Sequence, residues 1–280
     1  MRGRRKKKNK GLFSPKYLTW AVVGACILLV VAGWTYSRSI TDKPDVRPVA
    51  TEAEVLQEVV IPESTQSEMI DYTGFTVSFN SDKHQPNYVV WELTGEETDG
   101  EVPRRNKFLT DYRVKGCASD ADYRRSGYDR GHMAPAADMK WSQKAMEDCF
   151  YFTNICPQDK RLNSGAWGKL EAKCRQWAKK YGSLVIVCGP ILTDEMPDAI
   201  GPDRVPVPQR FFKVVLARDA NPPMAIGFIM NNGRVEGGMQ QAAVTVDEVE
   251  RVTGFDFFSA LPDDIENKVE AQTYTVSWTW

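Results

Sequence analysis

The sequence predicts an α+β fold whose central sheet is mainly antiparallel. Runs rich in β-branched and aromatic residues mark five strands, at residues 75–80, 88–93, 184–189, 211–217 and 225–230. Helical patterns fall between some of these runs without alternating with them strictly. That order favours an antiparallel sheet with flanking helices over a doubly wound parallel sheet.

Each expected helix begins or ends on a recognisable signal. Residues 142–150 start with Ser142, a good N-cap, and residues 245–254 start with Thr245 and Glu248 at capping-box spacing. The longest helix, over 166–182, ends on two lysines before a glycine.

Two further segments have weaker patterns. Residues 101–131 are rich in Gly, Asp, Ser and Arg, so we expect mostly loop there. Residues 151–158 form a short β-rich run, and we expect that strand to stop at Pro157.

The N-terminal part predicts a membrane anchor. No charged side chain occurs from Tyr17 to Ser37, and about 20 apolar residues in a helix cross a hydrocarbon layer of ~30 Å. Basic residues before the apolar run favour a cytoplasmic N-terminus, which places the rest outside the cytoplasm, as in a bacterial inner-membrane protein that faces the periplasm. A cleaved signal peptide, a lipoprotein acylated at Cys26 and a mitochondrial presequence match the pattern less well.

The chain therefore divides into four predicted parts. These are a basic cytoplasmic tail (1–16), a transmembrane anchor (17–36), a flexible linker (37–68) and a folded domain (69–280). The linker is acidic, contains prolines and has few aromatic residues, so it cannot bury enough apolar surface to fold alone. A partly ordered arm packed on the domain is the alternative.

The net charge of −1 conceals blocks of opposite sign. Residues 1–36 carry +8, residues 37–100 carry −9, residues 101–180 carry +7 and residues 181–280 carry −7. A cationic block within an acidic chain indicates a local anionic partner rather than general adhesion.

Cysteine usage gives no clear metal site. None of the six cysteines forms a C-x-x-C pair, and only two histidines, His84 and His132, could complete a zinc set. The cysteines after the anchor could form disulfides or serve as small buried side chains. They are Cys117, Cys149, Cys156, Cys174 and Cys188.

The stretch 126-SGYDRGHMAPAADM-139 places His132 among charged and small residues inside the cationic block. The chain has no G-x-S-x-G elbow for a serine triad and no G-x-x-x-x-G-K-[ST] phosphate loop. A two-metal phosphoesterase would need more carboxylates and histidines nearby. The remaining inventory suits metal-assisted attack of water on a phosphodiester.

A second polar group belongs to the long helix. At about 100° per residue, Asn163, Glu171 and Arg175 share one side of a helix. Amide and carboxylate oxygens are ligands for a hard cation such as Mg²⁺, and an arginine at this position can bind a phosphate in bidentate fashion. Arg130 lies two residues before His132, so one phosphate could touch both.

These residues resemble a known family. YDRGHMAPAADM is similar to the D-R-G-H signature of the ββα-metal (His-Me finger) nucleases, the DNA/RNA non-specific endonucleases that include endonuclease G. The block 154-NICPQDKRLNSGAWGKLE-171 resembles the family's Asn, Gln, Asn, Trp and Glu series, and 189-GPIL-192, 206-PVPQRFFKVV-215 and 253-TGFDFFSALPDDIE-266 also look familial. The resemblance covers roughly residues 70–275.

The resemblance implies a role for each matching residue. His132 would be the general base, and Asn163 the direct protein ligand of one Mg²⁺, with Mn²⁺ or another divalent cation as a substitute. Glu171 would hold water bound to that ion, and Arg130 and Arg175 would contact the phosphate. Without the resemblance, Asn163 reads as a helix N-cap, Glu171 as a solvated charge and the arginines as ion-pair partners.

Three more residues complete the implied substrate side. Asn154 would lie near the site with a supporting hydrogen bond. An upstream arginine is also expected to contact phosphate, and the spacing leaves Arg104 and Arg105 as equal candidates.

The implied activity is hydrolysis of DNA and RNA, single- or double-stranded, with little sequence preference and with 5′-phosphate ends. A phosphodiesterase of the same fold for small esters and a catalytically inactive nucleic-acid-binding protein are the alternatives. A homodimer is left open. The sequence contains no recognition-helix module or zinc finger for base-specific readout.

Overall fold

The computed structural model describes residues 57–273 and 275–280. The predicted tail, the predicted anchor and most of the predicted linker lie outside these residues. In the described part of the chain, no helix is long and apolar enough to span a membrane.

The main sheet has seven strands in the order β12-β11-β10-β7-β4-β3-β2, and each recorded pair is antiparallel. This confirms the predicted α+β class with a mainly antiparallel sheet. The strands are β2 (Glu68–Tyr72), β3 (Phe75–Asn80), β4 (Gln85–Thr94), β7 (Ser183–Pro190), β10 (Arg210–Ala217), β11 (Met224–Asn231) and β12 (Ala243–Val244).

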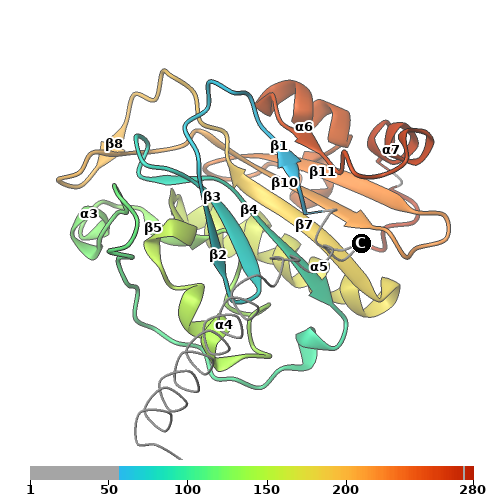
Figure 1. Cartoon of the computed structure of the whole chain (residues 1–280), viewed down its shortest axis with the longest axis horizontal. Helices are drawn as coiled ribbons and strands as arrows, with labels where there is room; N and C mark the ends of the chain where they lie inside the picture. The colour runs from blue at the N-terminus through green and yellow to red at the C-terminus, as the bar shows by residue number, and fades with distance from the viewer. Residues whose placement is uncertain (1–56, 274) are drawn as a thin grey trace, which may run out of the picture. The chain divides into compact units, whose positions relative to one another are not determined.

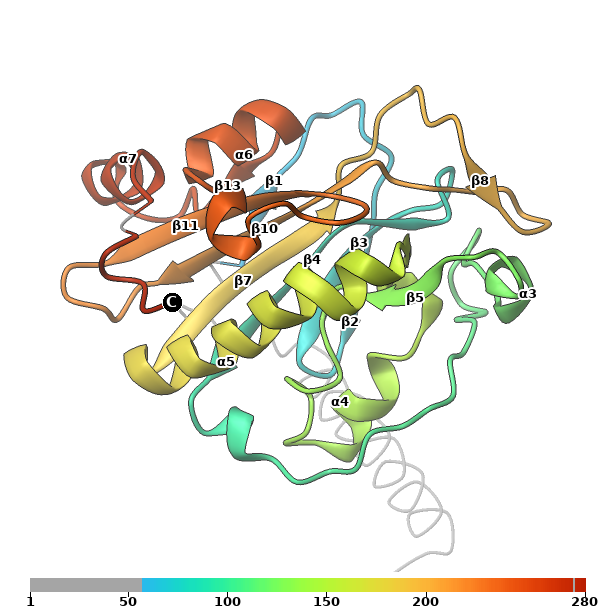
Figure 2. The same cartoon turned by 180° about the vertical axis from the view of Figure 1, so that it is seen from behind.

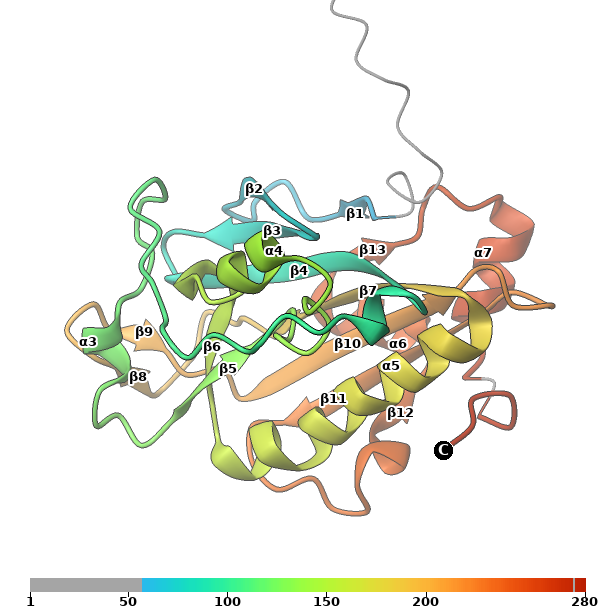
Figure 3. The same cartoon turned by 90° about the horizontal axis from the view of Figure 1, so that it is seen from below.

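Helices cover both faces of this sheet. Helix α5 (Gly168–Tyr181) runs across one face, while α6 (Val246–Thr253) and α7 (Asp263–Glu270) lie on the other (Figures 2 and 3). Each face has its own apolar core: α5 contributes Leu170 and Trp177 to one, and α6 contributes Val249 to the other.

Strand β10 shows how the sequence fills both cores. Phe211 and Val215 belong to the core under α5, whereas Phe212 and Val214 belong to the core under α6 and α7. This alternation follows from the period of two in a β-strand. Lys213 interrupts it, because its position faces α5 and its side chain is only 1% exposed.

Short elements surround the sheet (Figure 1). They are η1 (Glu97–Asp99), α3 (Asp120–Tyr123), β5 (Asp129–His132), α4 (Gln143–Asp148), η2 (Phe152–Asn154), β6 (Ile155–Gln158), η3 (Leu162–Trp167), β8 (Ala199–Ile200), β9 (Val205–Pro206) and η4 (Met239–Ala242). Two two-residue strands, β1 (Val59–Val60) and β13 (Asp256–Phe257), pair with each other.

The five predicted strands and three predicted helices are all present, with small shifts at their ends. Ser142 caps α4 by accepting a hydrogen bond from the backbone N–H of Ala145. Thr245 likewise accepts from the backbone N–H of Glu248, but the Glu248 carboxylate binds Arg251 instead of closing a capping box.

Several expectations were wrong. The D-R-G-H residues, expected in a loop, form strand β5, and Pro157 lies inside β6 opposite Arg130. Proline has no backbone N–H to donate to a neighbouring strand. It is tolerated in β6 because the β5–β6 ladder has only two strands, so no third strand needs that hydrogen bond. Residues 57–68, the end of the predicted linker, include β1, which pairs with β13 as the alternative of an arm packed on the domain implies.

Candidate active site

The β5–β6 hairpin carries His132. It pairs residue 132 with Ile155 and Gly131 with Cys156 in an antiparallel register. A Cβ at position 131 would lie 2.1 Å from Oε1 of Gln158, so any larger residue would force that buried side chain to move. The packing of the hairpin therefore favours glycine at this position of the D-R-G-H motif.

The imidazole of His132 is enclosed by aromatic rings. Its ring centroid lies 5.3 Å from that of Phe108 and 4.8 Å from that of Phe150, in an edge contact with the latter. The residue is 7% exposed, and its buried Nε2 has no hydrogen-bond partner among the described residues. A buried polar atom without a partner is uncommon in folded proteins and is often found at catalytic sites.

The electrostatics of this position keep the ring neutral. Burial, and secondly the positive charge of Arg104, lower the pKa of His132 to about 3. Both causes disfavour the imidazolium form. A neutral imidazole can accept a proton, which a general base must do.

Asn154 fixes the chain just after His132. Its Oδ1 accepts a hydrogen bond from the backbone N–H of Ala134 at 2.9 Å, and its Nδ2 donates to the carbonyl oxygens of Ala134 and Cys149, both at 2.9 Å. The side chain is completely buried. Asn154 therefore supports the hairpin through hydrogen bonds to the backbone. Because its side chain is completely buried, it does not face a substrate, although the resemblance groups it with the substrate-binding residues.

Asn163 is tied to the same hairpin. Its Nδ2 donates a hydrogen bond of 3.0 Å to Oδ2 of Asp129, the first residue of β5. Because the amide nitrogen is fixed by this bond, the carbonyl Oδ1 is the atom left to face a cation. Asp129 orients Asn163, a contact that sequence spacing alone does not reveal.

The backbone around Asn163 is not a regular α-helix. Residues 162–167 form a π-helical segment, with Gly165 at φ −103° and ψ −115°. The helical-wheel angles between Asn163 and Glu171 are therefore not those of a continuous helix. Regular α-helix begins at Gly168, so the angular argument holds for Glu171 and Arg175 only.

Four charged residues form a cluster near the start of the regular helix: Asp138, Glu171, Arg175 and Lys213. Nη1 of Arg175 donates a hydrogen bond of 2.8 Å to Oδ1 of Asp138, which is 1% exposed and also accepts from Nε1 of Trp91. The charges of both residues act on the partly buried Glu171. Burial raises the pKa of Glu171 to about 7, with Lys213 opposing the rise and Asp138 adding to it.

Lys213 and Asp138 are members of this cluster that sequence reasoning missed. Nζ of Lys213 lies 4.9 Å from the ring centroid of Trp91 and 4.6 Å from that of Trp167, in cation–π contact with both. One signal was present: Lys213 is a lone charge at an inward position of an otherwise apolar strand. Asp138 had no such signal.

The structure separates the two candidate arginines. The Arg104 guanidinium lies 5.2 Å from the ring centroid of Phe150, and its charge acts on His132 and Glu171. Arg105 forms an ion pair of 3.5 Å with Glu147. Of the two, Arg104 is thus the one whose charge acts on His132 and Glu171.

Arg130 lies on the same face of β5 as His132. Its Nη2 donates to Oδ1 of Asp120 at 2.6 Å, and its guanidinium stacks 5.5 Å from the ring centroid of Phe108 and 5.8 Å from that of Tyr123. Phe108 therefore contacts both Arg130 and His132, which explains how this face of the strand is held.

The donors at the site fit a hard divalent cation that keeps most of its water. Asn163 offers a neutral amide oxygen and Glu171 a carboxylate. Among the described residues, no group of three or more His, Cys, Asp and Glu side chains converges at the hairpin. The protein would supply few ligands, as Mg²⁺ prefers because it dehydrates reluctantly.

The five cysteines of the described part are all free, and four of them are buried. Cys188 lies in the sheet beneath the cluster, where its Sγ donates to the carbonyl oxygen of Met133 at 3.3 Å. The four buried side chains serve as small groups of the core.

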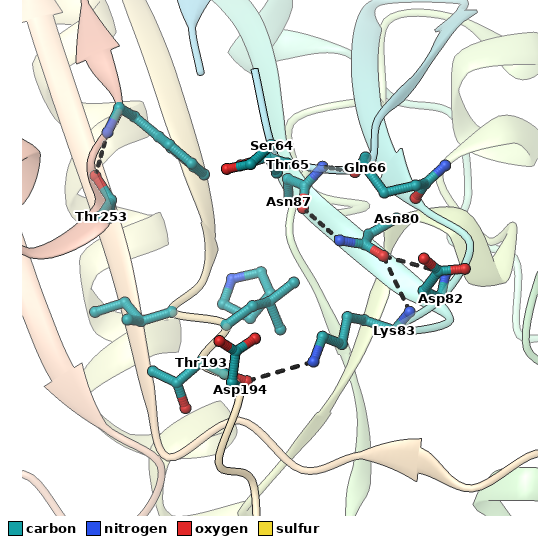
Figure 4. Close-up of a pocket in the computed structure, with 14 residues that line it drawn as sticks. Ser64, Thr65, Gln66, Asn80, Asp82, Lys83, Asn87, Thr193, Asp194 and Thr253 are labelled. Atoms are coloured by element: carbon teal, nitrogen blue, oxygen red, sulfur yellow. Dashed lines mark hydrogen bonds between the residues drawn. The ribbon is translucent and has the colours of Figure 1, made fainter. Parts of the chain in front are cut away.

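A separate hollow of about 470 Å³ lies near the turn between β3 and β4 (Figure 4). Its polar groups bind one another: Asn80 donates to Asn87 at 3.1 Å, and Lys83 donates to the carbonyl oxygen of Thr193 at 3.5 Å. None of the site residues lines it. This hollow is therefore separate from the candidate active site.

Comparison with known proteins identifies similar chains. A family model described as DNA/RNA non-specific endonuclease matches residues 52–264. The mitochondrial nuclease EXOG of Xenopus laevis is 32% identical over 276 residues, which cover 90% of this chain and 75% of that protein. The mitochondrial nuclease of Saccharomyces cerevisiae is 36% identical, over 67% of this chain and 64% of its own length.

Solved structures agree with the fold. A crystal structure of the EndoG/EndoGI complex, which concerns the inhibition of EndoG, matches with a TM-score of 0.67 and 27% identity. The match covers 74% of this chain and 90% of that chain. Human endonuclease G is 35% identical over 185 residues, which cover 61% of this chain and 62% of that protein.

Proposed function

Because the chain belongs to the DNA/RNA non-specific endonuclease family and is therefore an endonuclease, we propose that it hydrolyses phosphodiester bonds in DNA and RNA with one Mg²⁺, leaving 5′-phosphate ends. One observation carries this proposal. A neutral imidazole, His132, ends the hairpin strand whose first residue binds Asn163.

The imidazole of His132 takes a proton from the attacking water. Its aromatic walls hold the ring without protonating it, since neither Phe108 nor Phe150 can donate a proton. Binding of a phosphate beside Arg104 would compensate the charge that depresses the pKa of the ring and would strengthen it as a base. Positioned general-base catalysis contributes about 10²–10⁴-fold.

Asn163 would hold the divalent cation directly, and Glu171 would hold water bound to it. When bound, such an ion stabilises charge on the scissile phosphate and on the departing oxygen. Asp129 orients the Asn163 amide through the hydrogen bond of 3.0 Å. The kink at Gly165 separates Asn163 from the regular helix that carries Glu171.

Three guanidinium groups would neutralise the phosphate, namely those of Arg104, Arg130 and Arg175. Arg130 and Arg175 are each oriented by a carboxylate, Asp120 and Asp138 respectively. Prior orientation reduces the entropy lost when a phosphate binds. Such contacts read the backbone and not the bases, which suits a nuclease with little sequence preference.

The small-ester alternative is less favoured. The hollow of about 470 Å³ shares no residue with the site, and the segment of residues 101–180 carries a net charge of +7. A cationic surface suits a polyanion better than a single ester. An inactive binding protein is likewise less favoured, because a buried Nε2 without a partner on His132 is costly unless it has a use.

We also propose that residues 17–36 anchor the protein in a membrane with the nuclease domain outside the cytoplasm. The supporting observation is the uncharged apolar run after a basic N-terminal stretch. Several relatives carry the word mitochondrial in their names, which makes the mitochondrion the competing location. Retention of the full chain in the membrane fraction after alkaline extraction tests the anchor; complete release would contradict it.

The activity is tested with the full chain on plasmid DNA and on RNA, with Mg²⁺ and with a chelator. Degradation of both substrates is expected with Mg²⁺ only. His132→Ala should lower the rate by about 10²–10⁴-fold while DNA binding remains. His84→Ala is the matched control, since His84 binds the carbonyl oxygen of Gly116 away from the hairpin. Equal rates for both variants would refute His132 as the base.

A further inference from the structure

Three carboxylates converge on the face of the sheet opposite α5. Asp247 and Glu250 belong to α6, and Glu270 is the last residue of α7. One oxygen from each lies within 4.8 Å of the others. The two helices lie beside each other at the edge of the molecule (Figures 1 and 2).

Glu270 is the member that needs explanation. It is 6% exposed, and its Oε1 is buried without a hydrogen-bond partner among the described residues. Glu250 differs, because its Oε1 accepts a hydrogen bond of 2.9 Å from the backbone N–H of Phe257. A buried carboxylate oxygen without a donor is unfavourable unless a cation or a proton compensates it.

The surrounding charge is strongly negative. Residues 245–270 contain eight Asp and Glu side chains against two basic ones. Of the two, Arg251 binds Glu248, outside the trio. Burial, and after it the charges of Glu250, Glu266, Asp247 and Asp256, raise the pKa of Glu270 to about 9.

We propose that Asp247, Glu250 and Glu270 form a Ca²⁺ site that joins α6 to α7, separate from the nuclease site. Ca²⁺ takes oxygen ligands at roughly 2.3–2.6 Å in flexible geometry, so two oxygens on the same ion can lie up to about 5 Å apart. Mg²⁺ demands strict octahedral geometry and keeps several waters, so a set of three protein carboxylates suits Ca²⁺ better.

Helix α7 adds two favourable features. Its dipole places partial negative charge at the C-terminus, where Glu270 lies. The last carbonyl oxygens of a helix lack intrahelical partners and can serve as neutral ligands. Val249 and Val269 pack in the core beneath the trio, so an ion there would stabilise how the two helices pack on the sheet.

The proposal is tested by calorimetric titration of the full chain with CaCl₂ at pH 8, with Mg²⁺ in excess to fill the nuclease site. One Ca²⁺ per chain is expected to bind. At saturating Ca²⁺ the Tm should rise by about 5 °C, because a ligand that binds only the folded state stabilises it.

The matched variants are Glu270→Gln, Asp247→Asn and Asp264→Asn. The first two should weaken Ca²⁺ binding by about tenfold or more, since affinity depends on the number of charged ligands. Asp264, an exposed residue of α7 outside the trio, should leave both binding and the Tm shift unchanged. The exposed Asp247 can be changed with little risk to folding.

Two outcomes would overturn the proposal. One is a full chain that binds no Ca²⁺ in the presence of Mg²⁺; a proton on Glu270 would then explain the buried oxygen. The other is binding that persists unchanged in both Glu270→Gln and Asp247→Asn. Neither outcome depends on nuclease activity, so failure of the nuclease proposal would leave this test intact.

Discussion

At the scale of single residues, the proposed chemistry depends on an imidazole that stays neutral. Burial and the nearby Arg104 charge both depress the pKa of His132. The unfolded chain takes up a proton on this residue below about pH 6.5, whereas the folded chain does not. The unfolded state binds more protons in that window, so the stability contributed by His132 is lost as the pH falls from about 6.5 toward 3.

We expect NMR to detect this directly, because the chain has only two histidines. In His84→Gln, the one remaining imidazole signal should not titrate between pH 8 and pH 5. The same protein in denaturant should titrate near pH 6.5 and serves as the control. A midpoint between pH 6 and 7 in the folded protein would contradict the neutral, buried ring.

Lys213 illustrates a residue that supports a site without facing a substrate. It is 1% exposed, lies between the rings of Trp91 and Trp167, and offsets the negative charge of Glu171 and Asp138. We interpret it as a positioning residue that holds the carboxylates of the cluster in place.

Replacing Lys213 with methionine should therefore destabilise the fold. Removal of one partner from a buried charge cluster leaves the others uncompensated, at a cost of about 3–5 kcal/mol. Chemical denaturation would measure the free energy of unfolding. Lys169→Met, on the exposed side of α5, is the control and should change it by less than about 0.5 kcal/mol. Similar free energies of unfolding for both variants would contradict a structural role of Lys213.

At the scale of elements, the hairpin and the π-helical turn bring the site residues together. The β5–β6 ladder sets the position of His132, and the hydrogen bond from Asn163 to Asp129 connects the helix to the hairpin. Asn154 ties Ala134 to Cys149 behind them. Small shifts of the hairpin are therefore transmitted to the reacting groups.

Gly131→Ala should test how closely the hairpin is packed. The added Cβ would clash with the buried Gln158 side chain and displace His132. A displacement of about 1 Å can lower a rate by about 100-fold, so we expect a folded protein by circular dichroism with that loss of activity. Gly233→Ala is the control, because the nearest atom to its Cβ lies 3.9 Å away. Activity close to that of the parent protein in Gly131→Ala would show that the hairpin tolerates the change.

At the scale of the whole molecule, charge is segregated along the chain and across the sheet. The +7 block of residues 101–180 includes the arginines of the proposed nuclease site, whereas the acidic C-terminal block carries the carboxylate trio on the opposite face. A polyanion is attracted to the first and repelled by the second. This separation of charge would orient the protein with the proposed nuclease site toward the DNA.

The salt dependence of DNA binding should report the proposed contacts between the arginines and phosphate groups. Binding of DNA to His132→Ala is expected to weaken as salt rises, because each neutralised phosphate releases counterions. Arg104→Ala should reduce the slope of log K against log [salt] by about 1. Arg105→Ala, whose guanidinium is paired with Glu147, should change the slope less. Equal slopes for the two arginine variants would contradict the assignment of Arg104.

Some elements could be predicted because their signal is local. The strands at β7, β10 and β11 have dense β-branched and aromatic runs, and α4 has its N-cap serine. Others lacked that signal. Strand β2 is a partly exposed edge strand, α7 is short and acidic, and β5 is made of residues that normally occur in loops. Their pairing and packing partners, which the local sequence does not specify, determine their structure.

By itself, the sequence determined the α+β class and the main strands, and its motifs singled out His132, Asn163 and Glu171 as candidate site residues, because strand periodicity and motif spacing are local properties of the chain. Only the tertiary structure placed Arg104, and not Arg105, where its charge acts on His132, buried Lys213 beside Glu171 and brought Asp247 and Glu250 to Glu270. The physical reason is that these relations are set by packing between segments far apart in the chain, where burial and neighbouring charge fix what each side chain can do.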